Sequence, residues 1–210
     1  MVLKVLSAWV SRNANWKARL VVPYIHNHER VLDFGCGDLS LAREILKLRP
    51  ACHIVGIDVI DNSKKSTDIP FTTYDGKTLP YQDSSFDSVI SFYVYHHCDD
   101  PVAAFRECLR VARKRVILVE SVSRNSWDIP GMRLMDWIYN VIKFEGVSLP
   151  YTFLSLPKWR SVITDSGASL TRATRLKQLL FPSWMPVGIS YVFEVTKTRE
   201  VRRQKRKRLG

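Results

Sequence analysis

The sequence predicts an α/β fold, a Rossmann-like, seven-stranded, mostly parallel sheet with helices on both faces and an antiparallel last strand. Short apolar runs alternate with stretches of helical periodicity, and a glycine-rich turn follows the first run. The composition is globular, with 46% hydrophobic and 25% charged residues. It excludes a disordered chain, a collagen-like repeat and a membrane bundle.

The elements follow one another in the order that a parallel sheet requires. Short apolar runs predict strands at 30–34, 53–57, 71–74, 88–92, 116–119, about 169–176 and 189–196. Apolar residues at helical spacing predict helices at 2–22, 39–48, 101–112 and 158–166. Asp99 and Asp100 before Pro101 suit a helix cap followed by proline at the first helical position. This alternation implies crossover connections with helices on both faces of the sheet.

We expect one domain over residues 1–196, with a helical lid insertion at about 126–160 and a flexible basic tail at 197–210. The insertion is rich in Trp, Tyr, Met and Pro. The formal charge of +12 is concentrated in the tail, which holds eight Lys or Arg and one Glu. The tail is therefore a candidate for binding nucleic acid or another polyanion, for targeting, or for a solvated segment without a role.

Cysteine usage and hydropathy indicate the compartment. The four cysteines, Cys36, Cys52, Cys98 and Cys108, form no CxxC pair, so neither a disulfide scaffold nor a metal site is expected. No secretory signal is evident, and the longest uncharged stretch, 178–193, contains prolines and is too short for a membrane helix. We expect a cytoplasmic protein without a transmembrane segment.

The glycine-rich turn is the most informative segment. Gly35 and Gly37 lie between a strand and a helix, where backbone amides can approach a ligand closely. Asp58 ends the next strand, where a carboxylate can accept both hydroxyls of a ribose. Asp33 and Asp38 flank the glycines and would repel the pyrophosphate of a nicotinamide cofactor. The cationic S-adenosylmethionine is therefore favoured.

Four stretches resemble the class I S-adenosylmethionine-dependent methyltransferases, especially the type-11 group. They are VLDFGCG at 31–37, GID at 56–58, DGKTLPYQDSSFDSVIS at 75–91 and YHHCDDPVAAFRECLRVA at 95–112. The resemblance implies S-adenosylmethionine as cofactor and S-adenosylhomocysteine as product. Leu39 stands where the family has the third glycine of its turn.

The resemblance also implies where each part of the cofactor lies. The methionine part would meet the glycine turn, the ribose would meet Asp58, the adenine would lie at the third strand end, and Phe92 would stand at the methyl-donor end. The cofactor residues implied in this way are Asp33, Gly35, Cys36, Gly37, Asp58, Val59, Asp75, Gly76 and Phe92.

His96 and His97, just after the fourth strand, are the candidate general bases, because imidazole titrates near neutral pH. The alternative is that one of them packs against or caps the following helix. For the acceptor, the candidates are Tyr93, Asp136, Trp137, Asn140 and Tyr151. Asp136 and Asn140 lie four residues apart on one helix face in an aromatic setting, which suits a small organic substrate. A lid helix whose aromatics are simply core is the alternative.

These patterns predict a methyltransferase acting on a small-molecule or lipid-precursor acceptor by in-line displacement. A second hypothesis is an RNA or protein methyltransferase that grips phosphates with the tail and with Arg113–Arg115. The absence of the Asn/Asp-Pro-Pro-aromatic motif after the fourth strand weighs against it. A third is a non-catalytic binding protein, which the intact carboxylate set at 33, 58 and 75 disfavours.

Overall fold

A computed structural model describes residues 14–61, 68–143, 150–176 and 188–198, and a seven-stranded sheet forms its centre. The strands are β1 (Arg30–Phe34), β2 (His53–Asp58), β3 (Phe71–Thr73), β4 (Phe86–Phe92), β5 (Ala112–Val122), β6 (Ala168–Arg175) and β7 (Ile189–Lys197). Their spatial order is β3-β2-β1-β4-β5-β7-β6, and β7 alone among them runs antiparallel to its neighbours on both sides. The predicted fold class is confirmed.

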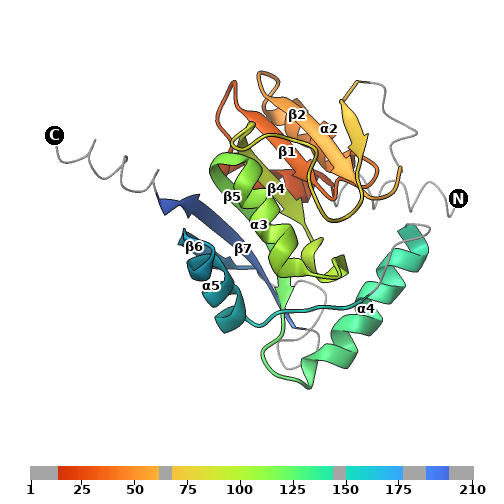
Figure 1. Cartoon of the computed structure of the whole chain (residues 1–210). Coiled ribbons are helices and arrows are strands. Elements are labelled where there is room, and N and C mark those ends of the chain that lie inside the picture. The colour runs from red at the N-terminus through yellow and green to blue at the C-terminus, as the bar shows by residue number, and fades with distance from the viewer. Residues whose placement is uncertain (1–13, 62–67, 144–149, 177–187, 199–210) are drawn as a thin grey trace, which may run out of the picture.

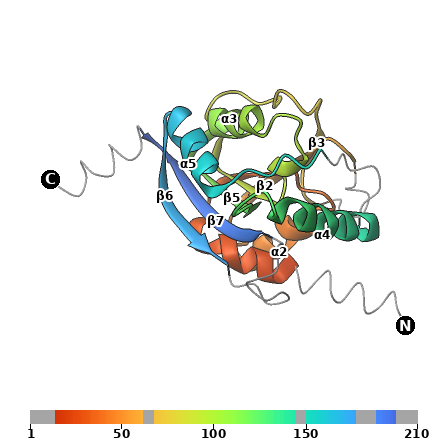
Figure 2. The same cartoon turned by 90° about the horizontal axis from the view of Figure 1, so that it is seen from below.

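Helices cover both faces of this sheet. They are α2 (Ser40–Leu48), α3 (Pro101–Val111), α4 (Asp128–Lys143) and α5 (Leu156–Asp165), with short 3-10 turns η1 (Val22–Tyr24) and η2 (Tyr95–His97). Residues 14–21 are also helical. Figures 1 and 2 show α3 and α5 on one face, and α2 with the chain before β1 on the other.

The core has two parts, one under each helical layer, because successive strand residues point to opposite faces. Leu32 of β1 is fully buried in the cluster that contains Phe105 of α3 and Trp159 of α5. Its neighbour Val31 is fully buried in the other cluster, which contains Ile45 of α2. The strands are thus apolar on both sides, as expected for parallel strands covered twice.

Strand β5 is longer than the predicted 116–119. It pairs in parallel with β4, and its residues Arg115–Val122 pair antiparallel with Ile189–Thr196 of β7. The apolar run alone did not reveal the charged beginning of the strand at 113–115. These basic side chains form ion pairs within the fold, with Glu29 and Asp87.

Helix α3 begins as predicted. Asp100 accepts hydrogen bonds from the backbone nitrogens of Val102 and Ala103, each at 2.9 Å, and Pro101 occupies the first helical turn. The side-chain oxygen therefore satisfies donors that have no partner within the helix. This end of α3 follows η2 directly and fixes where the segment after β4 turns back.

The region expected to be a lid contains α4, followed at 150–155 by chain without regular helix. The helix expected at 158–166 is α5, which begins two residues earlier. The expected lid role remains a prediction. Residues 1–13 and the basic residues 199–210 lie outside the described part of the chain. Within the described part, every helix is too short or too polar to cross a bilayer.

Candidate active site

The glycine turn lies at the carboxyl end of β1. Gly35 and Gly37 have φ of +69° and +53°, the left-handed region that glycine adopts without a steric penalty. The amides of Gly35 and Cys36 donate to the carbonyl of Ile57 at 2.9 and 3.2 Å, which ties the turn to the end of β2. A Cβ on Gly35 would lie 2.4 Å from a methyl group of Val94, so the chain after β4 closely approaches this glycine.

Leu39 stands where the family has the third glycine of the turn. It also adopts a positive φ, +60°, and its side chain is fully buried. A Cβ on Gly56 would lie 2.3 Å from Leu39 Cδ2, so this side chain occupies the space above the glycine of β2. The missing side chain of Gly56 thus leaves the room that Leu39 fills.

Asp33 is the most perturbed acidic residue of this turn. It is 1% exposed, and its Oδ2 atom accepts no hydrogen bond from the described residues. Burial, followed by repulsion from Asp58, raises its pKa to about 7, although the nearby Lys17 ammonium lowers it. A buried oxygen of this kind is costly unless a donor reaches it. The site therefore fits a ligand that carries an ammonium group.

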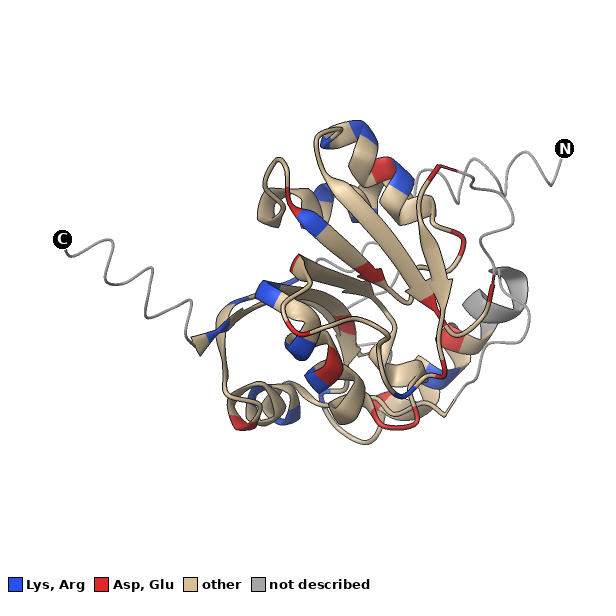
Figure 3. Ribbon diagram, turned by 45° about the horizontal axis from the view of Figure 1, so that its top comes forward, with Lys and Arg blue, Asp and Glu red and all other residues tan. Residues whose placement is uncertain are grey.

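Asp58 closes the same turn from the end of β2. Its Oδ2 accepts the Gly37 amide at 2.8 Å and its Oδ1 accepts the Val59 amide at 2.7 Å. Burial raises the pKa of Asp58, opposed by these backbone hydrogen bonds. Each carboxylate oxygen can accept more than one hydrogen bond, so capacity remains for ribose hydroxyls. Figure 3 shows acidic residues at the ends of neighbouring strands.

The predicted adenine side is more open. Asp75 is exposed, and its Oδ1 accepts the amides of Lys77 and Thr78 at 2.8 and 2.9 Å, which lowers its pKa. Gly76 has φ of +77°, and a Cβ there would lie 3.4 Å from Val59. Val59 is 52% exposed. The structure thus brings Gly76 and Val59 together, as an apolar wall would require.

Phe92, the last residue of β4, and Tyr93 after it lie beside a cation. The Lys17 ammonium lies 5.3 Å from the Phe92 ring centroid and 5.7 Å from that of Tyr93. Burial raises the pKa of the Tyr93 hydroxyl. Aromatic faces stabilise positive charge, so this corner of the site already accommodates a cation. Nothing in the residue pattern had indicated Lys17, because it comes from the helix at 14–21.

His96 is held between two carboxylates. Its Nδ1 lies 2.8 Å from Glu120 Oε2, and its Nε2 lies 3.2 Å from Asp136 Oδ1. Burial alone would lower its pKa, but the charge of Glu120 and hydrogen bonds to Asp136 and Glu120 outweigh it and raise the pKa to about 9. At neutral pH His96 is therefore an imidazolium that donates from both nitrogens.

Glu120 anchors this arrangement, and sequence reasoning missed it. It is 1% exposed at the end of β5, and its Oε1 accepts the amides of Val94 and Tyr95 at 2.7 and 2.9 Å. One carboxylate thus fixes both the backbone and the first histidine of η2. The signal in the sequence was a charged residue directly after the apolar run 116–119. Its partner His96 lies 24 residues away in the chain, so the sequence did not show the pairing.

Asp136 and Tyr151 join the histidines at the acceptor side. Asp136 Oδ1 lies 3.6 Å from His97 Nε2, and its charge adds to burial in raising the pKa of Tyr151. The ligand atoms of His96, His97 and Asp136 lie within 4.8 Å of one another, close enough to hold a metal ion. A hydrogen bond from the protonated His96 Nε2 to the Asp136 carboxylate explains why these two groups lie close together.

The remaining predicted acceptor residues, Trp137 and Asn140, have no described contact with the histidines. Trp137 is 50% exposed, and the side chain of Asn140 lies outside the described residues. The segment at 150–155 crosses η2, where the Thr152 amide donates to the His96 carbonyl at 3.1 Å and Phe153 stacks on the His96 ring at 4.6 Å. The histidines are therefore covered by chain from the predicted lid region.

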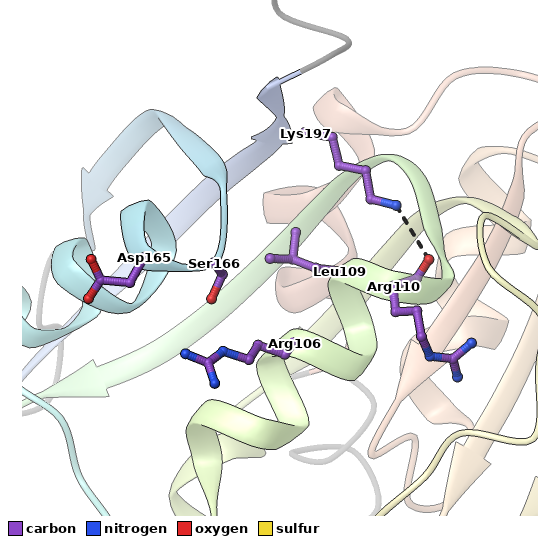
Figure 4. A pocket seen from close by; sticks show the side chains of 6 residues that line it. All are labelled: Arg106, Leu109, Arg110, Asp165, Ser166 and Lys197. Carbon is purple, nitrogen blue, oxygen red and sulfur yellow. Dashed lines mark hydrogen bonds between the residues drawn. The ribbon is translucent and has the colours of Figure 1, made fainter.

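One open hollow of about 410 Å³ lies elsewhere. Figure 4 shows its lining from α3, the end of α5 and the end of β7: Arg106, Leu109, Arg110, Asp165, Ser166 and Lys197. The last turn of α3 lies next to the amino ends of the parallel strands, because the helix runs back along the sheet. The hollow is therefore at the edge opposite to the glycine turn.

Comparison with known proteins agrees with this geometry. A family model described as a methyltransferase domain matches residues 32–119. A demethylmenaquinone methyltransferase from Thermotoga maritima is 26% identical over 142 residues, 64% of this chain and 62% of its own length. A malonyl-[acyl-carrier protein] O-methyltransferase from Legionella pneumophila is 30% identical over 90 residues, 39% of this chain and 32% of its own. The chain thus spans less than two thirds of these relatives.

Solved structures share the fold. Magnesium protoporphyrin IX methyltransferase from Synechocystis, solved with bound S-adenosylhomocysteine, superposes with a TM-score of 0.62 at 17% identity, covering 94% of this chain and 88% of its own. A chain from the complex of a Haloferax volcanii methyltransferase with its Trm112 activator gives 0.65 at 15% identity, covering 88% and 90%. Residues 32–119 are thus a methyltransferase domain similar to those of the class I S-adenosylmethionine-dependent methyltransferases, and S-adenosylmethionine is the cofactor of this domain.

Proposed function

We propose that the protein transfers a methyl group from S-adenosylmethionine to a small-molecule or lipid-precursor acceptor. One observation carries the proposal: the buried Asp33 Oδ2 has no hydrogen-bond donor among the described residues, beside a turn closed by Asp58. The α-ammonium of the cofactor would supply that donor, and its ribose would meet Asp58. When bound, the cofactor supplies an activated methyl group on a sulfonium.

The two adjacent histidines have different proposed roles. His96 is protonated below pH about 9 and engages both nitrogens, so it positions Glu120 and Asp136 rather than accepting a proton. His97 is the proposed general base, because its Nε2 lies 3.6 Å from Asp136 Oδ1 and its side chain is 17% exposed. It would take the acceptor's proton on its ring while the surrounding chain excludes water, and the Asp136 carboxylate would stabilise the imidazolium that forms.

The acceptor class rests on what surrounds the histidines. Tyr151, Phe153 and Asp136 form an aromatic wall with a charged group, which suits an organic acceptor. The two curated relatives are named for demethylmenaquinone and malonyl-[acyl-carrier protein], and neither acceptor is a nucleic acid. Arg113–Arg115, proposed from sequence as phosphate contacts, are paired with carboxylates, which weighs against the RNA alternative.

A methyl-transfer screen tests this function. Labelled S-adenosylmethionine is incubated with the protein and with separated metabolite, lipid and RNA fractions. We expect label in the metabolite or lipid fraction, and His97→Gln to lower kcat by about 100-fold without weakening S-adenosylhomocysteine binding. Removing residues 199–210 should leave turnover unchanged. Label confined to RNA, lost with those residues and restored at low salt, would contradict the proposal.

A further inference from the structure

Helix α4 exposes a row of large apolar side chains. Trp127, Leu134 and Trp137 are 83%, 52% and 50% exposed, and they are three of the five large hydrophobic residues exposed in the described part of the chain. Leu134 and Trp137 are three residues apart and share one face of the helix, and Trp127 lies in the turn directly before its first residue. Large apolar side chains exposed together on one element mark an interaction site.

The opposite side of the same helix is firmly attached to the protein. Met132 is 3% exposed and Asp136 reaches His96 across the site. Asp128, 1% exposed, accepts from the Arg124 backbone amide at 2.8 Å and from its guanidinium at 2.7 Å. Because these contacts fix the rotation of α4, the apolar row is held toward solvent and is no sign of a loosely packed helix.

The described acidic and basic side chains of α4 also lie on different sides of the helix. The carboxylates of Asp128 and Asp136 are 1% and 14% exposed and point into the protein, whereas Arg133 is exposed beside the apolar row. The whole chain carries +12, with eight basic residues and one acidic residue in 197–210. The outward face is thus apolar, rich in tryptophan and adjoined by the exposed Arg133, on a chain of net positive charge. Tryptophan and arginine together favour the interface of an anionic bilayer.

We propose that the outward face of α4, formed by Trp127, Leu134 and Trp137 with Arg133 beside them, docks on an anionic lipid surface. The helix would lie in the plane of the interface, with its apolar row among the headgroups and its inner side on the acceptor site. The same helix that contacts His96 through Asp136 would then border the lipid. A lipid-borne acceptor could pass directly to the histidines, and this last step rests on the proposed function.

Vesicle co-sedimentation of the full chain tests the docking. The probes are vesicles of phosphatidylcholine with 30 mol% phosphatidylglycerol, and vesicles of phosphatidylcholine alone, with no S-adenosylmethionine present. We expect binding to the anionic vesicles and a blue shift of tryptophan fluorescence. The double variant Trp127→Ser/Leu134→Ser should lower the partition coefficient by about 10-fold or more, because it removes two apolar side chains from the interface. Trp127→Phe should retain most of the binding.

Two controls separate the face from general charge. Arg106→Ser removes an exposed cation at the opposite edge of the sheet and should leave partitioning unchanged. Removing 199–210 should weaken binding yet preserve the difference between wild type and the double variant. The proposal would be overturned if the wild type and the double variant bound equally, with or without residues 199–210, or if the wild type did not bind. It would also be overturned if the double substitution only abolished self-association of a protein that does not bind vesicles. Binding of S-adenosylhomocysteine should be the same in every variant, which separates a failed docking proposal from a failed function.

Discussion

The cofactor half and the acceptor half of the site are built in different ways. The centre of the cofactor half, residues 31–58, consists of backbone positions and strand-end carboxylates close together in the sequence. The acceptor half is a side-chain network in which His96 meets Glu120 and Asp136, 24 and 40 residues away. A site formed by turns can be recognised from a short stretch of sequence, whereas a site formed by side-chain contacts depends on how elements distant in the sequence pack together.

The two halves also differ in electrostatics. In the cofactor half, Asp33 is a buried carboxylate whose pKa is raised to about 7 by burial and by Asp58. In the acceptor half, the carboxylates share one imidazolium, whose pKa they raise to about 9. The first half is poised to receive a cation from a ligand, whereas the second already holds the His96 imidazolium between its carboxylates. Substitutions in the two halves should therefore affect different measurements.

The largest expected effect is that of Gly35→Ala. The new Cβ would lie 2.4 Å from a Val94 methyl group at a φ of +69°. Strain and overpacking together should destabilise the fold by about 3 kcal/mol and weaken S-adenosylhomocysteine binding by about 100-fold or more. Urea unfolding and calorimetry measure the two effects.

Gly167→Ala is the matched control, because Gly167 has a φ of +70° but, chain neighbours aside, no atom of the described residues lies within 4 Å of the point that its new Cβ would occupy. It should show only the backbone strain, about 1 kcal/mol, with unchanged ligand affinity. The double variant Gly35→Ala/Val94→Ala should recover part of the binding. Equal effects of the two glycine substitutions would show that the contact with Val94 does not shape the turn.

The same contrast explains which features could be predicted from sequence. Strand–helix alternation and the turn at Gly35 and Gly37 were sufficient for the sheet, because both depend on local periodicity and backbone freedom. Glu120 and Lys17 were not predictable, since their roles arise only when β5 and the helix at 14–21 pack beside β4. The full length of β5 was missed because its charged start is stabilised by partners distant in sequence.

Glu120→Gln should produce the next largest effect. It leaves the His96 imidazolium without the nearer and more deeply buried of its two counter-ions, at a cost of about 3 kcal/mol in the free energy of unfolding at pH 7. In the wild type the His96 contribution, on the order of 3 kcal/mol, is fully present below its ordinary pKa of about 6.5 and is lost as the pH rises through about 9. The destabilisation should therefore shrink between pH 7 and pH 9.5.

Glu107→Gln serves as the control for that pH series. Glu107 pairs with Arg110 at 2.7 Å on the protein surface, and hydrogen bonds from that arginine lower its pKa. Its loss should cost less than about 1 kcal/mol, with no change across the same pH range. A pH-independent effect of Glu120→Gln would mean that His96 is neutral in the folded protein.

Asp33→Asn should change the pH dependence of cofactor binding. Because the pKa of Asp33 is raised to about 7, the carboxyl group is protonated at lower pH and loses its attraction for an ammonium group. Wild-type affinity for S-adenosylhomocysteine should rise by up to about 10-fold per pH unit between pH 5.5 and 7. Calorimetry should find a flat profile for Asp33→Asn, whereas Asp83→Asn, at an exposed surface position, should keep the slope.

The smallest expected effect is that of Asp100→Ala, which lies outside both the cofactor half and the acceptor half of the site. Asp100→Ala removes the cap of α3 and should lower the free energy of unfolding by about 1 kcal/mol. Asp100→Ser, which keeps a capping oxygen, should recover most of that loss. If the alanine variant also lost S-adenosylhomocysteine affinity, the start of α3 would have to be counted as part of the cofactor half.

The central claim is that the carboxylates at the ends of β1 and β2 bind the cofactor independently of the network on α4. Calorimetric titration of S-adenosylhomocysteine into Asp58→Ala and Asp136→Asn, side by side with wild type, tests it most directly. We predict a loss of about 10-fold or more for Asp58→Ala and a change within about 2-fold for Asp136→Asn. Equal losses in both variants, or unchanged affinity in Asp58→Ala, would contradict the claim.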